Sequence, residues 1–280
     1  MKLNIKSNIV NPKEISEMKI SILSTFYNDK KMMKLVMDSV LKQNCQEIEH
    51  VIVDAASTDG SVQLIKEYEK KYAQAGKELK WISEPDKGIY YGFNKAFELS
   101  SGDYIMVNAP DPFLDEFVFS DLTEVLTRES PDYVYGGVYY QKEGKIIRNW
   151  SGRPGNWRLG WMAATPTLCV KRKVMEKYGP FDTSNGAADY KFQLKLFRDS
   201  TLKSCAIERI IVVYFAGGTS NGGLKANLNS IKADLQALKE CGVTFPWFVS
   251  FCKIIRAIFA YTFVSHKNLD LTVLQEQKIT

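Results

Sequence analysis

Five acidic or amide side chains stand just after short apolar runs in this sequence. They are Asn28, Asp54, Asp86, Asn108 and Asp111. If the apolar runs are strands of one parallel sheet, their carboxyl ends share an edge, and ligands bind in the crevice outside that edge. We therefore expect these side chains to converge. Only two histidines occur, His50 and His266, which leaves little room for Ser-His-Asp hydrolysis or a histidine-rich metal site. Any chemistry is then expected to depend on carboxylates.

The first half of the chain alternates apolar runs with amphipathic segments. The runs at residues 19–24, 48–53, 79–82 and 104–107 predict strands, and apolar residues at helical spacing predict helices at about residues 29–41, 61–72 and 90–99. Asn28 or Asp29 is expected to cap the first helix. Repeated strand–helix–strand units are typical of an α/β fold with a mostly parallel central sheet and helices on both faces.

The rest of the chain carries further elements without an internal repeat. Strands are predicted at residues 133–140, 145–149 and 207–215, and helices at about 171–178, 187–197, 224–239 and 246–264. The first two of these strands flank a turn at Glu143 and Gly144. One α/β domain with a C-terminal helical appendage is the simplest organisation, and 280 residues are enough to bury its core.

Composition places the chain among globular proteins and excludes several classes. Its residues are 45% hydrophobic and 25% charged, which rules out a disordered chain or a collagen. A net charge of +5 is too small to argue for a nucleic-acid partner. Five widely spaced cysteines without a C-x-x-C pair argue against disulfides or zinc and favour a reducing compartment. Residues 1–17 are polar and show no signal peptide.

Polar segments follow the first three predicted strands. Residues 25–28 (TFYN) combine aromatic and small polar groups that suit a planar base, although a helix cap beside core aromatics is the more economical explanation. In residues 54–60 (DAASTDG), Ser57 and Asp59 are expected to cap the next helix, which leaves Asp54 to point into the crevice. In residues 84–90 (EPDKGIY), Lys87 could offset phosphate charge, although such turns also occur in plain loops.

The order and spacing of these segments resemble the family 2 glycosyltransferases with the GT-A fold. The resemblance is carried by ISILSTFYN, IEHVIVDAASTDGS, WISEPDKGIYYGFNKA, SSGDYIMVN and GGTSNGG, and it extends over residues 19–223. It implies a GT-A domain at residues 18–223, with a nucleotide-binding half (18–112) and an acceptor half (113–223). An N-terminal extension (1–17) would precede it and a C-terminal helical region (224–280) would follow. It also implies inverting transfer of a sugar from a nucleotide-sugar.

The resemblance further implies roles for individual residues. Thr25, Phe26 and Tyr27 would lie by the uridine of a UDP-sugar, and Asp54 would accept the N–H of the base. The other residues implied to line the nucleotide pocket are Ser57, Asp86, Lys87, Gly88, Asn94 and Asn108. A divalent cation, Mn²⁺ or Mg²⁺, is implied on the diphosphate, held by an acidic motif after the fourth strand.

This chain departs from the family at that acidic motif. The family's segment reads like Asn-Ser-Asp-Asp, whereas residues 108–112 read NAPDP, so Asp111 alone remains as the expected metal ligand. Magnesium often binds one or two carboxylates together with substrate phosphate, so a single Asp can suffice. Tyr91 and Thr165-Pro166 also stand where relatives often carry Asp and His-Gln.

The resemblance assigns the catalytic base to Asp189 in residues 186–190 (GAADY), just before an amphipathic helix. Direct displacement at an anomeric carbon needs a carboxylate that takes the proton of the acceptor hydroxyl. Without the resemblance, a helix-capping role for Asp189 is the simpler explanation. The glycine-rich residues 217–223 are expected to form a loop over the donor pocket, and they lack the spacing of an NTPase phosphate loop.

Two aromatic segments suggest contacts with the acceptor and with a membrane. The first is a basic and aromatic cluster in a long loop, which suits a sugar acceptor or a structured core loop equally well: Arg153, Trp157, Arg158 and Trp161. The second is residues 246–264, whose apolar residues at helical spacing flank a narrow basic stripe of Lys253 and Arg256. This pattern suits a helix lying in a membrane interface, or one packed on the domain or in a dimer.

The sequence therefore predicts a bacterial-type, metal-dependent glycosyltransferase that is cytoplasmic and peripheral at the inner membrane. It would move a sugar from a UDP-sugar to a glycan acceptor, expected to be lipid-linked, in surface polysaccharide synthesis. The alternative is a catalytically degenerate GT-A module that kept the fold for binding. A nucleotidyltransferase shares the layout, but the glycine- and basic-rich phosphate loop expected near the start of such a chain is missing.

Overall fold

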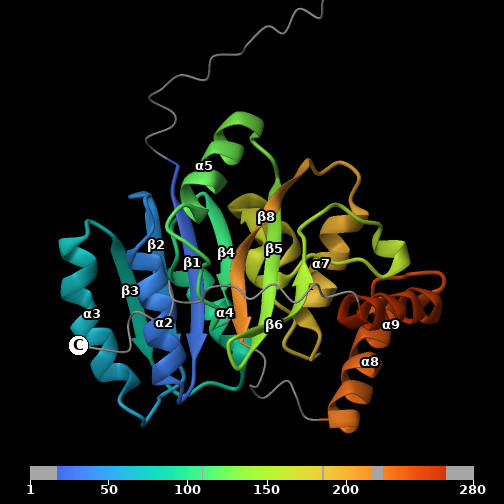
Figure 1. Ribbon diagram of the computed structural model, residues 1–280, viewed down its shortest axis with the longest axis horizontal. Coiled ribbons are helices and arrows are strands. Elements are labelled where there is room, and N and C mark those ends of the chain that lie inside the picture. The colour runs from blue at the N-terminus through green and yellow to red at the C-terminus, as the bar shows by residue number, and fades with distance from the viewer. Residues whose placement is uncertain (1–17, 109, 185, 216–222, 263–280) are drawn as a thin grey trace, which may run out of the picture.

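The computed structural model describes residues 18–108, 110–184, 186–215 and 223–262. A central sheet crosses the molecule with helices on both of its faces, and the last two helices, α8 and α9, stand beside one edge (Figure 1). The order of the strands across the sheet is β3-β2-β1-β4-β7-β5-β6, and β8 pairs with β5.

Four parallel strands form the first half of the sheet. β1 (Ile20–Phe26) pairs with β2 (Ile48–Asp54) on one side and with β4 (Tyr104–Asn108) on the other, and β3 (Glu78–Ser83) lies outside β2. Every residue of β1, β2 and β4 is buried, which is why these strands form nearly continuous apolar runs in the sequence. The register sets Phe26 opposite Asp54, and Asp54 opposite Ser83. The carboxyl ends of the strands thus share one edge, as the sequence predicts.

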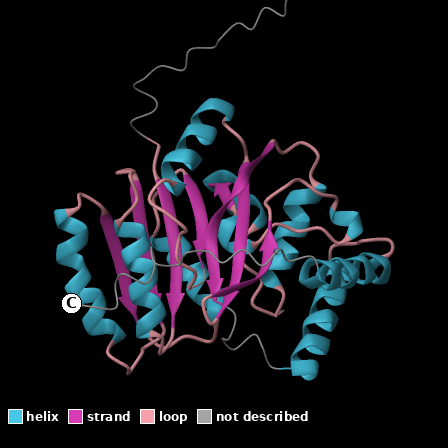
Figure 2. Ribbon diagram, in the orientation of Figure 1, coloured by secondary structure: helices cyan, strands magenta, loops and turns pink. Residues whose placement is uncertain are grey.

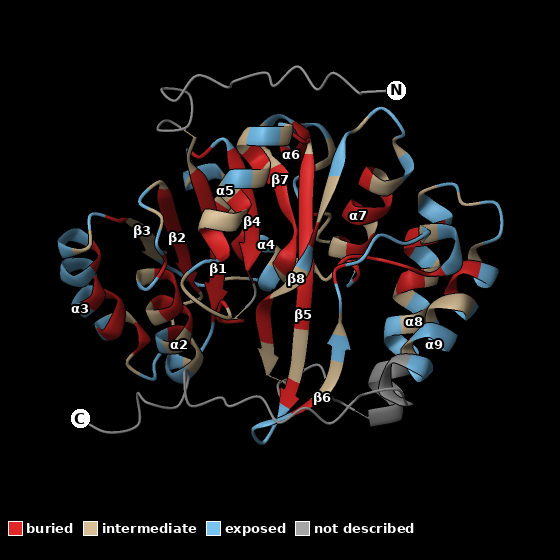
Figure 3. Ribbon diagram, turned by 45° about the horizontal axis from the view of Figure 1, so that its top comes forward, coloured by how far each residue is buried: buried red, intermediate tan, exposed pale blue. Residues whose placement is uncertain are grey.

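Two apolar clusters hold helices against the two faces of the sheet. In β1, Ile20 and Ile22 belong to one cluster and Leu23 to the other, because successive side chains of a strand alternate between faces. The first cluster includes α2 (Lys30–Leu41), α3 (Ser61–Gln74) and α5 (Val118–Glu129). The second includes α4 (Ile89–Leu99), α6 (Arg172–Tyr178) and α7 (Ala188–Arg198). The buried strands lie between helices whose outer faces are exposed (Figure 3).

The starts of α2 and α3 are linked by short polar contacts. Asp29 is the N-cap of α2, as expected, and its carboxylate accepts a hydrogen bond from the backbone N–H of Met32. The N-cap of α3 is Gly60, which has no side-chain cap. Asp59 accepts from the backbone N–H of Ser61 at the start of α3, whereas the hydroxyl of Ser57 accepts from Asn28. The expectation that Ser57 caps α3 is therefore wrong, because its hydroxyl joins the first two strand-end loops instead.

The second half of the sheet makes it mixed. β7 (Cys169–Lys171) runs antiparallel to β4, and β5 (Tyr133–Lys142) runs antiparallel to β7. β6 (Lys145–Trp150) forms a hairpin with β5, and β8 (Ser204–Phe215) is parallel to β5. Two 3₁₀ turns, η1 (Trp157–Leu159) and η2 (Thr165–Thr167), lie between β6 and β7. The predicted α/β fold is confirmed, with α5 and β7 added (Figure 2).

The two last described helices pack against α7. α8 (Gly223–Glu240) and α9 (Pro246–Thr262) share an apolar cluster with α7 that includes Tyr190, Leu194, Ala237 and Val249. α9 also contacts η1 and β6. Within the described residues, no helix is long and apolar enough to cross a membrane. The predicted glycine-rich loop at residues 217–223 lies outside the described residues except for Gly223, where α8 begins.

Candidate active site

Asp54 ends β2 with one carboxylate oxygen unused. The residue is fully buried, and its Oδ2 accepts hydrogen bonds from the backbone N–H of Ser57 (2.9 Å) and from the hydroxyl of Ser83 (2.7 Å). Its Oδ1 is buried without a hydrogen-bond partner among the described residues. A buried acceptor without a donor costs free energy, so Oδ1 is an atom that a donor group of a ligand would stabilise.

Thr25 and Asp86 meet at the first turn of α4. A Cβ placed on Gly92 of that helix would lie 2.6 Å from Cγ2 of Thr25 and 3.2 Å from Oδ2 of Asp86. The glycine thus allows α4 to approach both strand ends closely. Oδ1 of Asp86 accepts from the backbone N–H groups of Lys87 and Gly88, which shapes the turn before α4. The structure therefore brings the loops after β1 and β3 together, as the spacing predicts.

The other implied nucleotide residues differ in exposure. Phe26 is buried in the core, whereas 67% of Tyr27 is exposed and Lys87 is also exposed. The side-chain amide of Asn94 on α4 forms two hydrogen bonds with the backbone of Phe181. Its Nδ2 donates to the carbonyl of Phe181 (2.9 Å), and its Oδ1 accepts from the N–H of Phe181 (2.8 Å). Asn94 therefore links α4 to the loop before α7, and its amide binds the protein backbone.

Asp111 is buried in the loop after β4. Asn108 holds this loop, because its Nδ2 donates to the carbonyl of Asp111 (2.9 Å) and its Oδ1 accepts from the N–H of Asp111 (3.3 Å). Oδ2 of Asp111 is buried without a hydrogen-bond partner among the described residues. Burial raises the pKa of Asp111 to about 7, because the carboxylate loses its hydration. A cation or a proton would each relieve that penalty.

Asp189 lies in the first turn of α7 with its carboxylate held from two sides. Oδ1 accepts from the hydroxyl of Tyr90 on α4 (2.8 Å), and Oδ2 accepts from the hydroxyl of Thr165 in η2 (2.8 Å). Thr165 in turn accepts from Nε2 of Gln193, one helical turn after Asp189 (2.9 Å). The N-cap of α7 is Ala187, without a side-chain cap. The contacts of Asp189 therefore differ from those of a capping residue.

The hydrogen bonds of Asp189 leave it able to act as a base. Each carboxylate oxygen has two lone pairs, so one hydrogen bond per oxygen leaves room for an acceptor hydroxyl. Burial and the neighbouring Asp189 raise the pKa of Tyr90, so this phenol stays protonated and remains a donor. The carboxylate is thus oriented by neutral donors on both sides.

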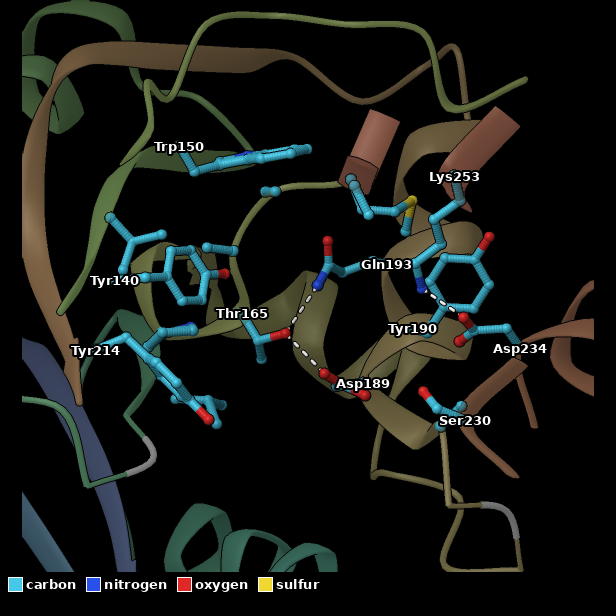
Figure 4. Close-up of a pocket in the computed structure, with 18 of the residues that line it drawn as sticks. Tyr140, Trp150, Thr165, Asp189, Tyr190, Gln193, Tyr214, Ser230, Asp234 and Lys253 are labelled. Carbon is cyan, nitrogen blue, oxygen red and sulfur yellow. Dashed lines mark hydrogen bonds and ion pairs between the residues drawn. The ribbon is translucent and has the colours of Figure 1, made fainter. Parts of the chain in front are cut away.

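Asp111 and Asp189 line the same cavity. This cavity has a volume of about 470 Å³ and lies between the sheet and helices α4, α7, α8 and α9. Figure 4 shows Thr165 between Gln193 and Asp189, and Tyr140, Trp150 and Tyr214 across the cavity from them. The cavity is large enough for a sugar ring beside the two carboxylates.

Cationic side chains line the wall formed by β6 and α9. Lys253 on α9 forms an ion pair with Asp234 on α8 (2.6 Å), and its ammonium lies 3.9 Å from the ring centre of Tyr190. The guanidinium carbons of Arg148 and Arg256 lie 5.1 Å and 5.6 Å from the ring centre of Trp150. All of these residues line the cavity. Lys253 and Arg256, the expected basic stripe of α9, therefore both face the cavity.

The basic and aromatic loop cluster does not line this cavity. Trp161 is buried in the core, with Tyr135 and Phe197 each 5.2 Å away between ring centres. Arg158 lies over the ring of Trp157 at 4.6 Å. Arg153 is exposed and forms an ion pair with Glu208 at 3.6 Å. Of this loop, Gly160 borders the cavity, because its lack of a side chain lets it approach the backbone of Lys253.

Several residues of the site carry no motif of their own in the sequence. Gln193 follows Asp189 by four residues, so helical spacing alone places both on one face of α7. Tyr90 lies within the EPDKGIY segment. The residues from β6, α8 and α9 come together only through the fold, and no local pattern predicts Arg148, Trp150 or Asp234 as neighbours of Asp189.

Asp111 is the candidate ligand for a divalent cation among the described residues of the cavity. No group of three or more His, Cys, Asp or Glu side chains in the described part of the chain could hold a metal ion. The partnerless Oδ2 of Asp111 suits a hard cation, and the amide of Asn108 is already used to hold the loop. The residues therefore fit a cation whose other ligands are diphosphate oxygens and waters.

Comparisons with known proteins agree with this architecture. The family model for Glycosyl transferase family 2 matches residues 21–202. A "PGL/p-HBAD biosynthesis glycosyltransferase" of Mycobacterium bovis is 23% identical over 211 residues, which cover 72% of this chain and 78% of that protein. The "Glycosyltransferase GlyG" of Streptococcus pneumoniae is 23% identical over 200 residues, covering 71% of this chain and 60% of that protein.

Solved structures show the same fold. TarS 1-349 of S. aureus in complex with UDP-GlcNAc matches 79% of this chain and 67% of its own length, with a TM-score of 0.62 and 16% identity. The mannosyltransferase PcManGT from Pyrobaculum calidifontis, in complex with GDP-Man and Mn²⁺, matches 92% of this chain and 78% of its own length, with a TM-score of 0.60 and 15% identity. The family resemblance read from the motifs is thereby confirmed: the chain belongs to glycosyl transferase family 2 and has the GT-A fold.

Proposed function

We propose that this protein transfers a sugar from a UDP-sugar to a hydroxyl of a glycan acceptor, with inversion at the anomeric carbon. The observation that carries the proposal is the shared cavity of Asp111 and Asp189. In this proposal Asp111 would hold the cation of a donor diphosphate, and Asp189 would serve as the base for an acceptor hydroxyl. A single cavity thus has the groups that one direct displacement requires.

The nucleotide would bind along the ends of β1, β2 and β3. Oδ1 of Asp54 lacks a donor, and the N–H of a uracil base would supply one. Thr25 and Asp86 lie together at the start of α4, where the ribose and base would contact them. Support for uridine comes from the similar TarS structures, which hold UDP-GlcNAc and UDP. The mannosyltransferase structure holds GDP-Man, so the choice of base needs a direct test.

Asp189 would take the proton of the acceptor hydroxyl as that oxygen attacks the anomeric carbon. The bond to the UDP oxygen breaks from the opposite face, so the configuration inverts. Thr165 and Tyr90 hold the carboxylate toward the cavity during this step. A divalent cation bound by Asp111 would offset the negative charge of the departing diphosphate.

The acceptor is proposed to be lipid-linked, at the inner face of a bacterial membrane, in surface polysaccharide synthesis. Support comes from α9, whose outer side exposes large apolar residues: Trp247, Phe248, Phe251, Ile254 and Ile255. Trp247 and Phe251 are 66% and 56% exposed. Aromatic residues on an amphipathic helix suit the membrane interface. Because α9 also borders the cavity, a membrane-bound acceptor would enter close to Asp189.

The test is a calorimetric titration of the full chain with UDP, GDP and ADP, each with and without Mn²⁺. We expect UDP to bind best, and Mn²⁺ to strengthen its binding in the wild type but not in Asp111→Asn. Asp189→Asn should bind UDP normally but should no longer hydrolyse or transfer sugar from a panel of UDP-sugars. Asp103→Asn, which changes an exposed carboxylate elsewhere, is the matched control.

Two results would overturn the proposal. Wild-type turnover by Asp189→Asn would remove the base assignment. Absence of binding by any nucleotide would instead favour a degenerate GT-A module that binds glycans without catalysis. Preference for GDP would keep the transferase reaction and change the donor.

A further inference from the structure

We propose that the cavity wall formed by Arg148, Trp150 and Arg256 is a subsite for a phosphate group carried by the acceptor. This inference rests on the proposed transferase function and adds the chemical class of the acceptor. The subsite joins residues of β6 and α9, which come together only in the folded chain.

The two arginines are gathered around one aromatic ring. Arg148 and Trp150 are two residues apart on β6, so their side chains share a face of the strand. The guanidinium carbon of Arg148 lies 5.1 Å from the ring centre of Trp150, and that of Arg256 lies 5.6 Å from it. Arg148 also lies 4.9 Å from the ring centre of Tyr140. Cation–π contacts orient the guanidinium groups of Arg148 and Arg256 through the face of the ring and do not themselves require the N–H donors.

The charge on this wall is incompletely balanced within the protein. Lys253 is paired with Asp234 at 2.6 Å, which accounts for one cation of the wall. Arg256 forms no ion pair of 4 Å or less with any described residue, although it borders the cavity. Two guanidiniums near one ring repel each other unless an anion lies between them. The wall is therefore arranged to attract a negatively charged group.

A phosphate fits this wall better than a carboxylate does. One guanidinium fork satisfies the two oxygens of a carboxylate, whereas a phosphate has further oxygens for a second fork. The rings of Tyr140 and Tyr214, whose centres lie 5.0 Å apart, line the same cavity, so a sugar or lipid attached to the phosphate would lie near them. Figure 4 shows these rings and Trp150 on the side of the cavity opposite Asp189.

The position of the wall separates it from the donor. β6 ends the strand order on the side opposite β3, and the implied nucleotide residues follow β1, β2 and β3. Asp111, the residue expected near the donor diphosphate, follows β4 in the middle of the sheet. A phosphate held by Arg148 and Arg256 would therefore belong to the acceptor and would place the acceptor hydroxyl toward Asp189.

The experiment measures binding of two phosphate probes by calorimetry, with UDP and Mn²⁺ present to occupy the donor site. Glucose 1-phosphate represents a sugar phosphate and decyl phosphate a lipid phosphate, with methyl glucoside and decyl maltoside as uncharged controls. We expect binding of at least one phosphate probe, and about tenfold weaker binding in Arg148→Gln and in Arg256→Gln, as for loss of a charge-assisted hydrogen bond. Arg128→Gln removes the same charge from the exposed surface of α5 and should change nothing.

The controls separate this proposal from the proposed function. Arg148→Lys keeps the positive charge but loses the two parallel N–H donors of the guanidinium. If Arg148→Gln does not fold, this variant tests whether those paired donors are needed for phosphate binding. No binding of either phosphate probe to the wild type would overturn the subsite, as would equal binding in all variants. A loss of UDP affinity in the arginine variants, with probe binding unchanged, would overturn the acceptor subsite and assign Arg148 and Arg256 to the donor site. Probe binding without any nucleotide binding would keep the subsite and overturn the donor assignment.

Discussion

Oγ1 of Thr165 stands between Asp189 and Gln193, donating a hydrogen bond of 2.8 Å to the carboxylate and accepting one of 2.9 Å from the amide. This hydroxyl therefore fixes the side of Asp189 opposite Tyr90. Because η2 carries Thr165 and α7 carries the other two, the contact also joins two segments around the cavity. Its role in the proposed reaction is to position the base.

Thr165→Val should reduce transfer and leave donor binding unchanged. Valine matches threonine in shape, but it removes both hydrogen bonds and leaves the amide of Gln193 without its acceptor. We expect the turnover number to fall about tenfold, as for loss of a hydrogen bond to a charged group. Thr165→Ser, which keeps the hydroxyl, should restore most of the activity. Equal turnover in Thr165→Val and wild type, measured by UDP release, would contradict the positioning role.

Asp111 should make the metal-free protein less stable as the pH rises. Its pKa is about 7 in the folded protein against an ordinary value of 3.8, so the native state holds a proton that the unfolded chain has lost between these values. The free energy of unfolding then falls as the pH rises from about 4 to 7, by at most about 4 kcal/mol. Urea unfolding at several pH values should show this slope, and Asp111→Asn should remove it. Asp103→Asn should keep it.

His50 should produce the opposite dependence. It is fully buried, with its ring nitrogens 2.7 Å from the hydroxyl of Tyr72 and 3.0 Å from that of Ser24. Burial lowers the pKa of His50 to about 3 from 6.5, so below pH 6.5 the unfolded chain binds a proton that the native state does not. Stability is then lost as the pH falls from 6.5 toward 3, by about 1.4 kcal/mol per unit in mid-range. His50→Gln should flatten this loss, and an unchanged acid limb would show that other groups cause it.

Gly160→Ala should displace α9. A Cβ at this residue would lie 2.2 Å from the backbone nitrogen of Lys253 and 2.5 Å from its Cα, and the φ angle is +71°. Gly144 has a similar φ of +78° but nothing within 4 Å of a Cβ, so Gly144→Ala measures the backbone strain alone. That strain costs about 1 kcal/mol. Calorimetric melting should show a clearly larger loss for Gly160→Ala, and equal losses would mean that α9 accommodates the side chain.

Trp247 and Phe251 should carry membrane binding, if α9 docks as proposed. Replacing both by serine should lower the partition of the protein onto lipid vesicles at least tenfold, since each buried aromatic side chain contributes about 2 kcal/mol. Because Lys253 is paired with Asp234 and Arg256 lines the cavity, neutral and anionic vesicles should differ little. Cosedimentation measures both effects. Leu228→Ser, an exposed apolar residue on α8, is the control, and equal losses in both variants would argue against a specific role of α9.

The first half of the fold could be predicted because its local signals agree. β1, β2 and β4 are buried on both faces and stand in the sequence as apolar runs, and the helices between them have one apolar stripe each. β7 is three residues long, too short to show a period, and its identity as a strand depends on β4 and β5 beside it. α5 buries Val118, Phe119, Leu122 and Leu126 at helical spacing, so its amphipathic pattern is local to the sequence.

Residues of the candidate site could be predicted where they directly follow a strand. The apolar runs predict that Asp54, Asp86 and Asp111 follow strands, and the family resemblance implies the role of Asp189. The wall of Arg148, Trp150 and Arg256 could not be predicted, because two of these residues lie more than 100 positions from the third. Trp161 differs in the other direction. An aromatic residue in a polar loop suggests a contact with a ligand, but the ring of Trp161 is buried in the core.

The attachment of α8 and α9 has a consequence for how such proteins diversify and can be engineered. These two helices follow β8. They contact the rest of the molecule through an apolar cluster with α7, through the Lys191–Glu240 ion pair (2.6 Å) and through contacts of α9 with η1 and β6. Asp189 and Asp111 lie entirely outside them. Exchanging residues 223–262 between relatives would therefore replace one wall of the cavity as a unit, while Asp189 and Asp111, the proposed base and metal ligand, stay in place.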